Sequence, residues 1–431
     1  MSQVSEIFDG LLDNLRVDNS GTLAMRRDQI TKVLNREFRY LDDSTNHKLM
    51  VGSYGRWTAI KGISDLDLLF ILPPAIRGDY NSDGDASRIL SRTREAIQAR
   101  YPGTSVTVDR LVVVVEFANF MFEVQPVFVN DDESFSYPDT YADGWKITKP
   151  REEISAMRSE NLSTKGNLRQ LCKLARAWKN KHGVALGGLL IDTLAYNFMT
   201  TNPDYRSIAM SSYDEMVRDF FLFLAEQPDQ ERYLALGSRQ HVRVKKKFQR
   251  KAKKAYDLSV EAIEAEGQKN VSKKWRAVFG NSVPIVDVLK SLSAGASPDE
   301  TEEFIEDQYY LDVRYDVTID CTVTQDGFRP HSLRDTVRLS RLLPAKKELT
   351  FKIIGSDVPE PFDVRWKVLN RGPEAERRKS VRGQIIESSH GRDRREVTSF
   401  RGRHLVECYI VRNGVVVARD DIEVPISSAF N

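Results

Sequence analysis

Few residues in this sequence could crosslink the chain or bind zinc. The 431 residues include three cysteines, Cys172, Cys321 and Cys408, which lie far apart and form no CxxC pair. This pattern argues against a disulfide framework and against a zinc ribbon, and it fits a reducing cytosol. The six histidines are equally scattered and include no HxxxH pair, so a structural zinc site is not expected.

Long apolar runs are also lacking. The longest, Leu66–Leu72 and Leu111–Val115, are far shorter than the roughly 20 residues with which a helix crosses a bilayer. Residues 1–18 have no basic start followed by an apolar core, so they do not resemble a signal peptide. We therefore expect a cytoplasmic protein that is not associated with a membrane.

Charge of one sign is not in excess either. The formal net charge is +2, so any attraction to nucleic acid has to come from a local patch. The composition, 41% hydrophobic and 29% charged, is typical of a globular protein with a substantial core. At roughly 100–200 residues per domain, the length predicts two or three domains.

The first 150 residues mix helical and strand periods. Residues Met25–Leu41 and Ser87–Arg100 place apolar side chains at three- and four-residue steps, which predicts two helices. The runs Val106–Glu116 and Met121–Phe128 are rich in β-branched and aromatic residues, which predicts the two arms of a hairpin. This region is therefore expected to be a small sheet with helices.

The period changes twice further along the chain. Residues 151–290 are helical in pattern, whereas the region from residue 300 to the end alternates with a period of two. The small residues at 291–299 between them predict a linker. Asn413-Gly414, between two alternating runs, predicts a tight hairpin, so the last region is expected to be an all-β module of the sandwich type.

Two carboxylates at the start of a predicted strand carry the clearest chemical signal. Asp65 and Asp67 open the run Leu66–Leu72, and the two-residue period of a strand places both side chains on one face. Neighbouring carboxylates repel each other and are costly to desolvate, and a bound cation removes that cost. Oxygen ligands of this kind select hard ions such as Mg²⁺.

Glu123 is the candidate for a third carboxylate. It lies between Phe122 and Val124 in a run otherwise suited to burial, and an adjacent strand would bring it beside the aspartate pair. Asp65, Asp67 and Glu123 would then hold two Mg²⁺ ions, with Mn²⁺ as a possible substitute, which can activate an attacking hydroxyl and stabilise a leaving pyrophosphate. Each of these motifs taken alone is more often a solvated strand face or a turn.

A short glycine turn precedes the aspartates. In Gly52-Ser53, backbone N–H groups are able to face a phosphate and the serine hydroxyl adds one more donor. The pair by itself is common in turns. The prediction of a nucleotide-binding role rests on the combination of the turn, the aspartate pair shortly after it and the third acid on a later strand.

These segments together resemble the polymerase-β-type nucleotidyltransferases and, more narrowly, the bacterial cGAS/DncV-like nucleotidyltransferases that make cyclic oligonucleotides. The C-terminal region resembles the adenylyl/guanylyl and SMODS C-terminal sensor domain. The segments that carry the resemblance are Gly52–Ala59, Ser64–Asp67, Glu123 and Lys273–Gly280 in the first part of the chain, and Cys321–Phe328, Val358–Trp366 and Thr398–Gly402 in the second.

The resemblance implies an α/β fold class, with a polymerase-β-like nucleotidyltransferase core, a helical lobe and a C-terminal β-sandwich-like domain. The expected bounds are 1–150 for the catalytic lobe with its N-terminal helix, 151–290 for the helical lobe that closes the nucleotide cleft, and 300–431 for the sensor-type domain. It also implies that Lys173 contacts the donor triphosphate. Gly187-Gly188 stands where relatives often have a phosphate-binding serine, so only backbone N–H groups remain there.

The activity implied by the resemblance is the joining of ribonucleoside triphosphates, ATP and/or GTP among them, into a cyclic di- or trinucleotide. This product would activate a downstream effector in anti-phage defence. Animal relatives are switched on by double-stranded nucleic acid, but this chain has no zinc-ribbon spacing, so such activation is not expected. The alternatives are a linear oligonucleotide synthase, a single-nucleotide transferase acting on a protein, RNA or small molecule, and a catalytically silent nucleotide sensor.

One basic stretch stands apart from this scheme. Residues Arg239–Lys254 are rich in lysine and arginine, and part of the stretch lies on the predicted helix Val242–Glu266. Clustered cations favour nucleic acid through counterion release, but acidic residues follow directly on the same predicted helix. A solvated or domain-facing helix is the preferred interpretation, and its lysines would also raise the positive potential of a triphosphate cleft.

Overall fold

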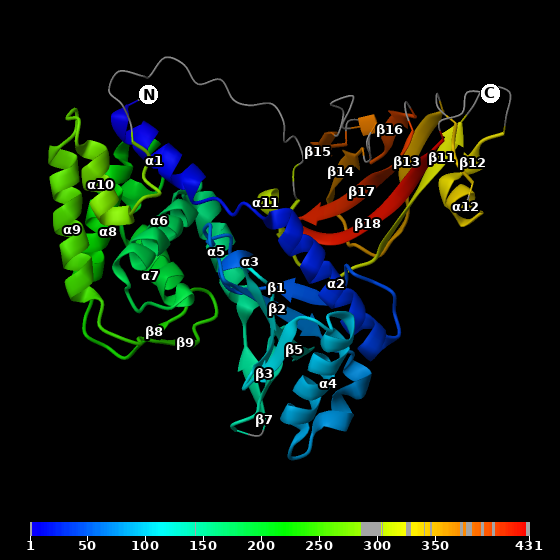
Figure 1. Ribbon diagram of the computed structural model, residues 1–431, viewed down its shortest axis with the longest axis horizontal. Helices are drawn as coiled ribbons and strands as arrows, with labels where there is room; N and C mark the ends of the chain where they lie inside the picture. Colours follow the sequence, from blue (N-terminus) through cyan, green and yellow to red (C-terminus); the bar gives the residue numbers. More distant parts are fainter. Residues whose placement is uncertain are drawn as a thin grey trace. The chain divides into compact units, whose positions relative to one another are not determined.

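The structure is a computed structural model of the chain (Figure 1). It describes residues 2–142, 144–285, 303, 305–324, 329–339, 341–344, 347–370, 374–375, 382–388, 392–398 and 401–427. The predicted linker at residues 291–299 lies outside the described residues. The chain divides into two compact units, Met1–Asp42 with Met50–Ala294 and Asp43–Leu49 with Gly295–Asn431, which are described separately below.

A seven-stranded sheet with the order β1-β2-β5-β4-β3 lies in the first part of the chain, and β6 and β7 continue it from β5. The central strands β2 and β5 run parallel, whereas β5 pairs antiparallel with β4 and with β6. The strands are β1 (Lys48–Met50), β2 (Asp65–Ile71), β3 (Ser105–Asp109), β4 (Val112–Glu116), β5 (Met121–Val129), β6 (Phe135–Asp139) and β7 (Gly144–Thr148).

The prediction of one strand over Val106–Glu116 is wrong, because β3 and β4 are separate strands joined at Arg110. No glycine, proline or asparagine marks this turn in the sequence. A tertiary contact holds it instead: the Arg110 guanidinium donates from Nε and Nη2 to the two carboxylate oxygens of Asp139, at 2.8 Å each. The second predicted strand agrees with β5, which pairs with β4 as expected for a hairpin.

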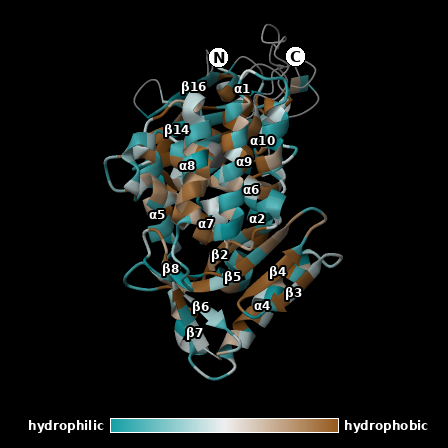
Figure 2. Cartoon of the chain, turned by 90° about the vertical axis from the view of Figure 1, so that its left-hand side faces the viewer, coloured by the Kyte–Doolittle hydropathy of each residue, from teal (hydrophilic) through white to brown (hydrophobic). Residues whose placement is uncertain are grey.

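Two helices, α2 (Ser20–Arg39) and α4 (Asp85–Arg100), cover one face of this sheet. Their apolar stripes pack against alternate residues of the strands. The shared core includes Ile30, Leu34 and Phe38 of α2, Ile89, Leu90 and Ile97 of α4, and Leu66, Leu68, Phe70, Phe122 and Val124 of the sheet. Since side chains alternate along a strand, the residues between these point to the other face. The all-valine start of β4 appears as a brown strand in Figure 2.

A helical lobe follows the sheet and has its own core of aromatic and aliphatic side chains. The first helix, α1 (Gln3–Asn14), also belongs to this core, because Phe8 packs edge-on against Trp275 with ring centroids 4.9 Å apart. The other α-helices of the lobe are α5 (Pro150–Ser163), α6 (Asn167–His182), α7 (Gly188–Thr201), α8 (Tyr213–Ala225), α9 (Gln249–Glu264) and α10 (Val271–Phe279). Short 3₁₀ turns in this unit are η1 (Pro74–Tyr80), η2 (Pro203–Tyr205) and η3 (Met210–Ser212).

The predicted helix Val242–Glu266 is correct only from Gln249 onwards. Residues His241–Arg243 instead form β9, which pairs antiparallel with β8 (Arg232–Leu234). A run of lysines and arginines gives little hydrophobic period, so the pattern could not separate the strand from the helix that follows it.

The second unit contains two sheets. One has the order β10-β18-β17-β14-β15 and the other the order β12-β11-β13-β16. Their strands are β10 (Tyr310–Leu311), β11 (Val317–Thr324), β12 (His331–Ser332), β13 (Glu348–Ser356), β14 (Asp363–Leu369), β15 (Arg382–Glu387), β16 (Arg394–Val397), β17 (Gly402–Arg412) and β18 (Val415–Ile426), with the short helices α11 (Ile305–Gln308) and α12 (Leu333–Arg338).

One core joins the two sheets, with Phe351 from the smaller sheet and Trp366 and Cys408 from the larger, so this unit is the expected sandwich-like module. Asn413 and Gly414 have positive φ angles of 51° and 67° at the turn between β17 and β18, which confirms the predicted hairpin. No described helix combines the length and the apolarity that a membrane crossing requires.

Candidate active site

The central strands of the first sheet bring the predicted carboxylates together. In the parallel pairing of β2 with β5, Asp67 lies directly opposite Glu123. Asp65 precedes Asp67 by two residues and therefore points to the same face. The opposite face carries Leu66 and Leu68, which are buried under the helices. Asp65, Asp67 and Glu123 thus share the face of the sheet that the helices α2 and α4 leave uncovered.

This face forms one wall of a cleft of about 520 Å³. The cleft lies between the sheet and the helical lobe, and both contribute polar side chains to it. Its lining includes Gly52, Ser53, Arg56, Asp65, Asp67, Glu123, Gln125, Glu153, Arg176, Lys179, Asn180, Gly188 and Leu189.

The carboxylates in the cleft are electrostatically disfavoured. Burial raises the pKa of Asp67, and the nearby charge of Asp65 adds to this, although Arg56 opposes it. Burial also raises the pKa of Glu123, with further contributions from Asp67 and Asp65. Both shifts express the same cost, which is the placing of several negative charges close together in a partly desolvated site.

These residues fit a divalent cation in chemistry and in register. The donor set consists of carboxylates alone on two adjacent strands, and a cation would relieve the repulsion that raises the pKa values of Asp67 and Glu123. Within the described ranges, no three or more His, Cys, Asp or Glu side chains are already gathered in a metal-binding arrangement. The fit therefore rests on the donor chemistry and the strand register.

The glycine turn lies directly against the aspartates. It forms the one-turn helix α3 (Gly52–Gly55), and Val51 N donates to the Asp67 carbonyl at 3.0 Å. Gly52 has a φ of +64°, and a Cβ at this position would lie 1.8 Å from Asp67 Oδ2. Both the backbone conformation and the close carboxylate therefore require glycine here. The Ser53 carbonyl accepts from Thr58 N at 2.9 Å, which fixes the turn.

A buried charged network connects this turn to the helical lobe. Arg56 donates from Nε to Asp192 Oδ2 at 2.8 Å and from Nη1 to Glu153 Oε2 at 3.2 Å. Arg176 donates to both oxygens of Asp192 at 2.6 and 2.9 Å, and the Thr58 hydroxyl donates to Asp192 at 3.0 Å. Burial acts to raise the pKa of Asp192, but the two arginines outweigh it and hold the pKa below its ordinary value.

Sequence reasoning missed Asp192 and Arg176. The signal was nevertheless present. Asp192 interrupts the apolar run of α7, and Arg176 interrupts the buried face of α6. A charged residue on the apolar face of a helix is costly unless it is paired, so such a position indicates a buried partner.

Lys173 lies on α6 as expected, but it is not among the residues that line the cleft. Arg176, Lys179 and Asn180 line it instead, and they lie one to two turns further along the helix. The predicted triphosphate contact of Lys173 therefore stays a prediction, and the structure adds Lys179 as a candidate, since Arg176 already donates to both oxygens of Asp192. Burial, followed by the charges of Arg176 and Lys245, lowers the pKa of Lys179.

The start of α7 also reaches the cleft. Gly188 is its first residue, and both Gly188 and Leu189 line the cleft. The first N–H groups of a helix have no partner within it and carry partial positive charge, which suits a phosphate. Arg176 donates to the Gly188 carbonyl at 3.2 Å, which holds this helix start beside the charged network.

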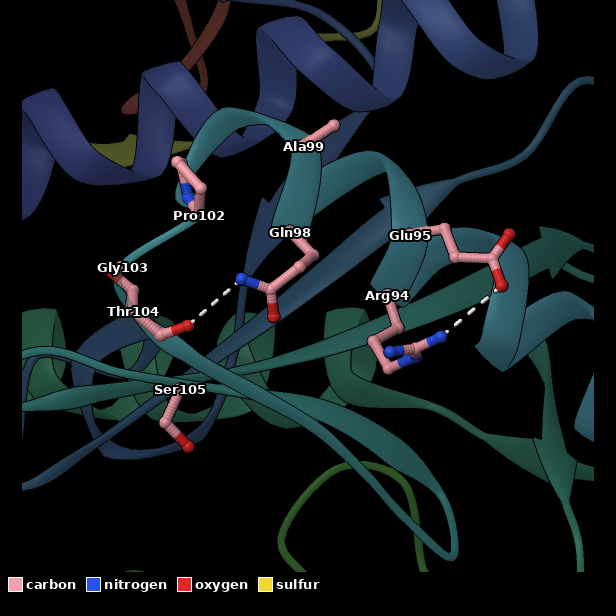
Figure 3. A pocket seen from close by; sticks show the side chains of 8 residues that line it. All are labelled: Arg94, Glu95, Gln98, Ala99, Pro102, Gly103, Thr104 and Ser105. Carbon is pink, nitrogen blue, oxygen red and sulfur yellow. Dashed lines mark hydrogen bonds and ion pairs between the residues drawn. The ribbon is translucent and has the colours of Figure 1, made fainter.

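A second hollow of about 720 Å³ lies at the end of α4 and offers no comparable chemistry. It is lined by residues 94, 95, 98, 99 and 102–105 (Figure 3). Its charged residues, Arg94 and Glu95, pair with each other at 3.3 Å. Gln98 donates to the carbonyls of Tyr101 and Thr104, so this amide closes the end of the helix.

Two family models match the chain. The model described as the second messenger oligonucleotide or dinucleotide synthetase domain matches residues 1–161, and the adenylyl/guanylyl and SMODS C-terminal sensor domain matches residues 299–427. A comparison with curated proteins gave no match.

Among solved structures, the chain is similar to CdnC of E. coli MS115-1 in complex with HORMA-deltaN, with 15% identity and a TM-score of 0.50 over 66% of this chain and 98% of that chain. The structure of the same CdnC with ATP gives 16% identity and a TM-score of 0.48 over 66% and 99% of the two chains. Vibrio cholerae DncV cyclic AMP-GMP synthase with nonhydrolyzable GTP gives 14% and 0.44 over 55% and 69%.

The first of these likenesses concerns the fold, and it agrees with the helix and sheet arrangement described above. The synthetase model covers the part of the chain that carries the three carboxylates, and the sensor model covers the sandwich. The chain is a nucleotidyltransferase and belongs to the bacterial cGAS/DncV-like nucleotidyltransferases that carry a C-terminal sensor domain.

Proposed function

We propose that this protein joins ribonucleoside triphosphates into a cyclic di- or trinucleotide and releases pyrophosphate. The observation that carries the proposal is the strand register, which sets Asp67 opposite Glu123, with Asp65 on the same face. The Gly52-Ser53 turn lies beside them in a cleft of about 520 Å³. The match to a second messenger synthetase domain supports the same conclusion.

Asp65, Asp67 and Glu123 would hold two divalent cations, Mg²⁺ or Mn²⁺. When bound, such ions lower the pKa of an attacking hydroxyl and neutralise the charge that develops on a leaving pyrophosphate. Because the pairing of two adjacent strands fixes the backbone positions of these residues, ion binding requires little further ordering of the backbone.

The triphosphate of the donor nucleotide is assigned to the space between the glycine turn and the helical lobe. On one wall, the Ser53 hydroxyl and the backbone of the turn would donate hydrogen bonds to phosphate oxygens. On the other wall, Arg176, Lys179 and the first N–H groups of α7 carry positive charge. Lys173 remains a candidate one turn away on the same helix.

The reaction then follows from positioning. The acceptor ribose hydroxyl attacks the donor α-phosphorus, and the bond from this phosphorus to the pyrophosphate group breaks on the opposite side. The linear product would turn in the cleft, and a second attack of the same kind would close the ring. We propose further that the cyclic product activates a downstream effector in anti-phage defence.

The test is a product analysis. The purified protein is incubated with the four ribonucleoside triphosphates and Mg²⁺ or Mn²⁺, treated with phosphatase and examined by mass spectrometry. We expect a phosphatase-resistant species with the mass of a cyclic oligonucleotide, which Asp67→Asn does not form. A phosphatase-sensitive chain would favour the linear synthase instead, and product formation by Asp67→Asn would contradict the assignment.

A matched control for Asp67→Asn is available on the same sheet. Asp109 on β3 is exposed, and it does not line the cleft, although its charge contributes to the raised pKa of Glu123. Asp109→Asn removes the same charge by the same chemical change. We expect it to keep the activity of the unchanged protein, so a loss in Asp67→Asn alone points to the site and not to the net charge.

A further inference from the structure

The hairpin β8–β9 carries an unusual pairing of like charges. Arg232 on β8 lies directly opposite Arg243 on β9, and both side chains are exposed. Like charges directly opposite each other on paired strands are destabilising. Arg239 in the turn and Lys245 and Lys246 after β9 are exposed as well, so positive charge gathers on a short piece of chain.

The neighbouring carboxylates do not neutralise this group. Asp229 precedes β8 and forms an ion pair with Lys247, so that lysine is excluded from the group. Glu231 contributes its carbonyl, which accepts from Val244 N at 2.8 Å. Within the described residues, no carboxylate forms an ion pair with the cations named above, which we call the cationic rim: Arg232, Arg239, Arg243, Lys245 and Lys246.

Hydrogen bonds hold the hairpin in place beside the cleft. Gln240 donates from Nε2 to the Ile147 carbonyl at 2.9 Å and accepts from Lys149 N at 3.0 Å. These contacts flank Thr148 and Pro150, which line the cleft. The Gln240 side chain therefore fixes the position of the hairpin relative to the cleft, because its amide bonds to the backbone on both sides of Thr148.

The turn of the hairpin is fixed by a second set of contacts. Ser238 donates from Oγ to Glu153 Oε1 at 3.2 Å, and Glu153 lines the cleft. Gly237 has a φ of +67°, and a Cβ there would lie 2.2 Å from the Glu152 carbonyl, so the turn packs directly on the backbone of α5. The hairpin also lies against α7, and Figure 1 labels both of its strands beside this helix.

The charge of this segment reaches the cleft. After burial and Arg176, Lys245 is the next contributor to the lowered pKa of Lys179, which lines the cleft. The charge of Lys245 therefore acts on the helical wall of the cleft, to which Lys179 belongs. Together with the contacts of Gln240 and Ser238, this charge effect supports a place for the rim-bearing hairpin beside the cleft.

The opposite wall of the cleft is negatively charged, which disfavours the approach of a triphosphate. Before cations bind, Asp65, Asp67 and Glu123 repel an approaching triphosphate, and the net charge of the chain, +2, gives no general attraction. A local group of cations at the mouth of a cleft raises the concentration of an anionic substrate there and speeds its association. We propose that the cationic rim is a capture site for the triphosphate groups of the substrates. This inference rests on the proposed function.

The proposal is tested by charge reversal at matched positions. The rim variant carries Arg243→Glu, Lys245→Glu and Lys246→Glu, and the control variant carries Lys254→Glu, Lys269→Glu and Lys273→Glu, which are exposed residues of α9, α10 and the segment between them. Both variants change the net charge by the same amount. Arg243→Glu also places an opposite charge across from Arg232, so the rim variant is expected to keep its Tm.

Initial rates of pyrophosphate release give KM and kcat for the nucleoside triphosphates over a range of salt concentrations. For the rim variant we expect kcat/KM to fall about ten-fold or more at low ionic strength, through KM, and to approach that of the unchanged protein as salt rises. The control variant is expected to match the unchanged protein. Equal effects in the two variants, or a loss confined to kcat, would overturn the proposal.

Two further measurements distinguish a failure of the capture-site proposal from a failure of the proposed function. If the unchanged protein forms no product, calorimetric binding of a nonhydrolysable nucleoside triphosphate replaces the rates, and unaltered affinity in the rim variant would refute the capture site. Binding of a labelled nucleic-acid duplex is measured in parallel. If the rim variant loses duplex binding but retains its nucleotide KM, the rim serves nucleic acid and the proposal is wrong.

Discussion

Two groups of charged side chains lie in or directly behind the walls of the same cleft, and their electrostatic environments are opposite. Asp67 and Glu123 lie close together with raised pKa values. Asp192 is completely buried, yet two arginines and a threonine satisfy it and its pKa is lowered. In the first group, which we call the strained group, the carboxylates repel one another. In the second, the complete group, two arginines neutralise the buried carboxylate. The difference separates residues that we propose to bind a cation from residues that hold the walls of the cleft together.

The largest expected effect comes from removing a charge from the strained group. Glu123→Gln should lower the rate of pyrophosphate release by about 10³-fold, because several kcal/mol of transition-state charge stabilisation depend on the cations. The same change should not lower Tm in the absence of metal, since it removes a carboxylate whose pKa burial has raised. Rates and thermal scans of the same preparation check both points.

Glu116→Gln is the control for this variant. Glu116 is an exposed carboxylate on β4, and its register partner is Met121 of β5 rather than a residue of the cleft. Its activity should stay close to that of the unchanged protein. If Glu123→Gln and Glu116→Gln are equally active, Glu123 does not belong to the catalytic group.

Replacing a carboxylate by an amide in the complete group should instead lower the stability of the protein. Asp192→Asn leaves Arg56 and Arg176 buried without their full counter-charge, and breaking a buried ion pair in this way typically costs about 3–5 kcal/mol of stability. Urea unfolding measures the loss. A variant as stable as the unchanged protein would show that the network does not stabilise the contact between the glycine turn and the helical lobe.

These two groups also mark how far the sequence alone could reach. Asp65 and Asp67 share a face because of the strand period, and Gly52-Ser53 stands close by in sequence, so both were accessible from local patterns. Pairing Asp67 with Glu123 needed only the assumption of adjacent strands. The contacts of Asp192 with Arg56 and Arg176 depend on which faces of α3, α6 and α7 meet, and that is decided by packing.

The misplaced elements have the same cause. The turn at Arg110 depends on the distant Asp139, and the strand β9 depends on its pairing with β8. Neither has a local signal strong enough to compete with the pattern around it. The helices α6, α7 and α8, which bury long apolar stripes, lie within the region predicted to be helical, because the spacing of their apolar residues both indicates a helix and provides the face that packs.

The next effect is a pH dependence with opposite signs in the two groups. The folded state holds protons on Asp67 and Glu123 more tightly than the unfolded state, so in EDTA these residues lower stability as pH rises from about 4 through their raised pKa values. Asp192 has a lowered pKa, so its contribution is present above the ordinary aspartate range and is lost as pH falls through the lowered value.

Thermal scans across pH separate these contributions. Relative to the unchanged protein in EDTA, Asp67→Asn should gain stability as pH rises, whereas Asp192→Asn should lose most at neutral pH and least in acid. Adding Mg²⁺ or Mn²⁺ should raise the Tm of the unchanged protein but not that of Asp67→Asn, because a ligand stabilises only the state that binds it. Parallel curves for the three proteins would contradict the distinction between the groups.

The smallest expected effect concerns the two lysines of α6 and sharpens the boundary of the cleft. Lys179 lines the cleft and has its pKa lowered by burial and by neighbouring cations, whereas Lys173 does not line it. Lys179→Ala should therefore raise KM for the nucleoside triphosphates several-fold with little change in kcat, since a single partly exposed cation is worth about 1 kcal/mol to a bound anion. Lys173→Ala should change KM less. The reverse order in steady-state kinetics would mean that the triphosphate lies nearly two turns closer to the start of α6 than the cleft indicates, where the family resemblance places it.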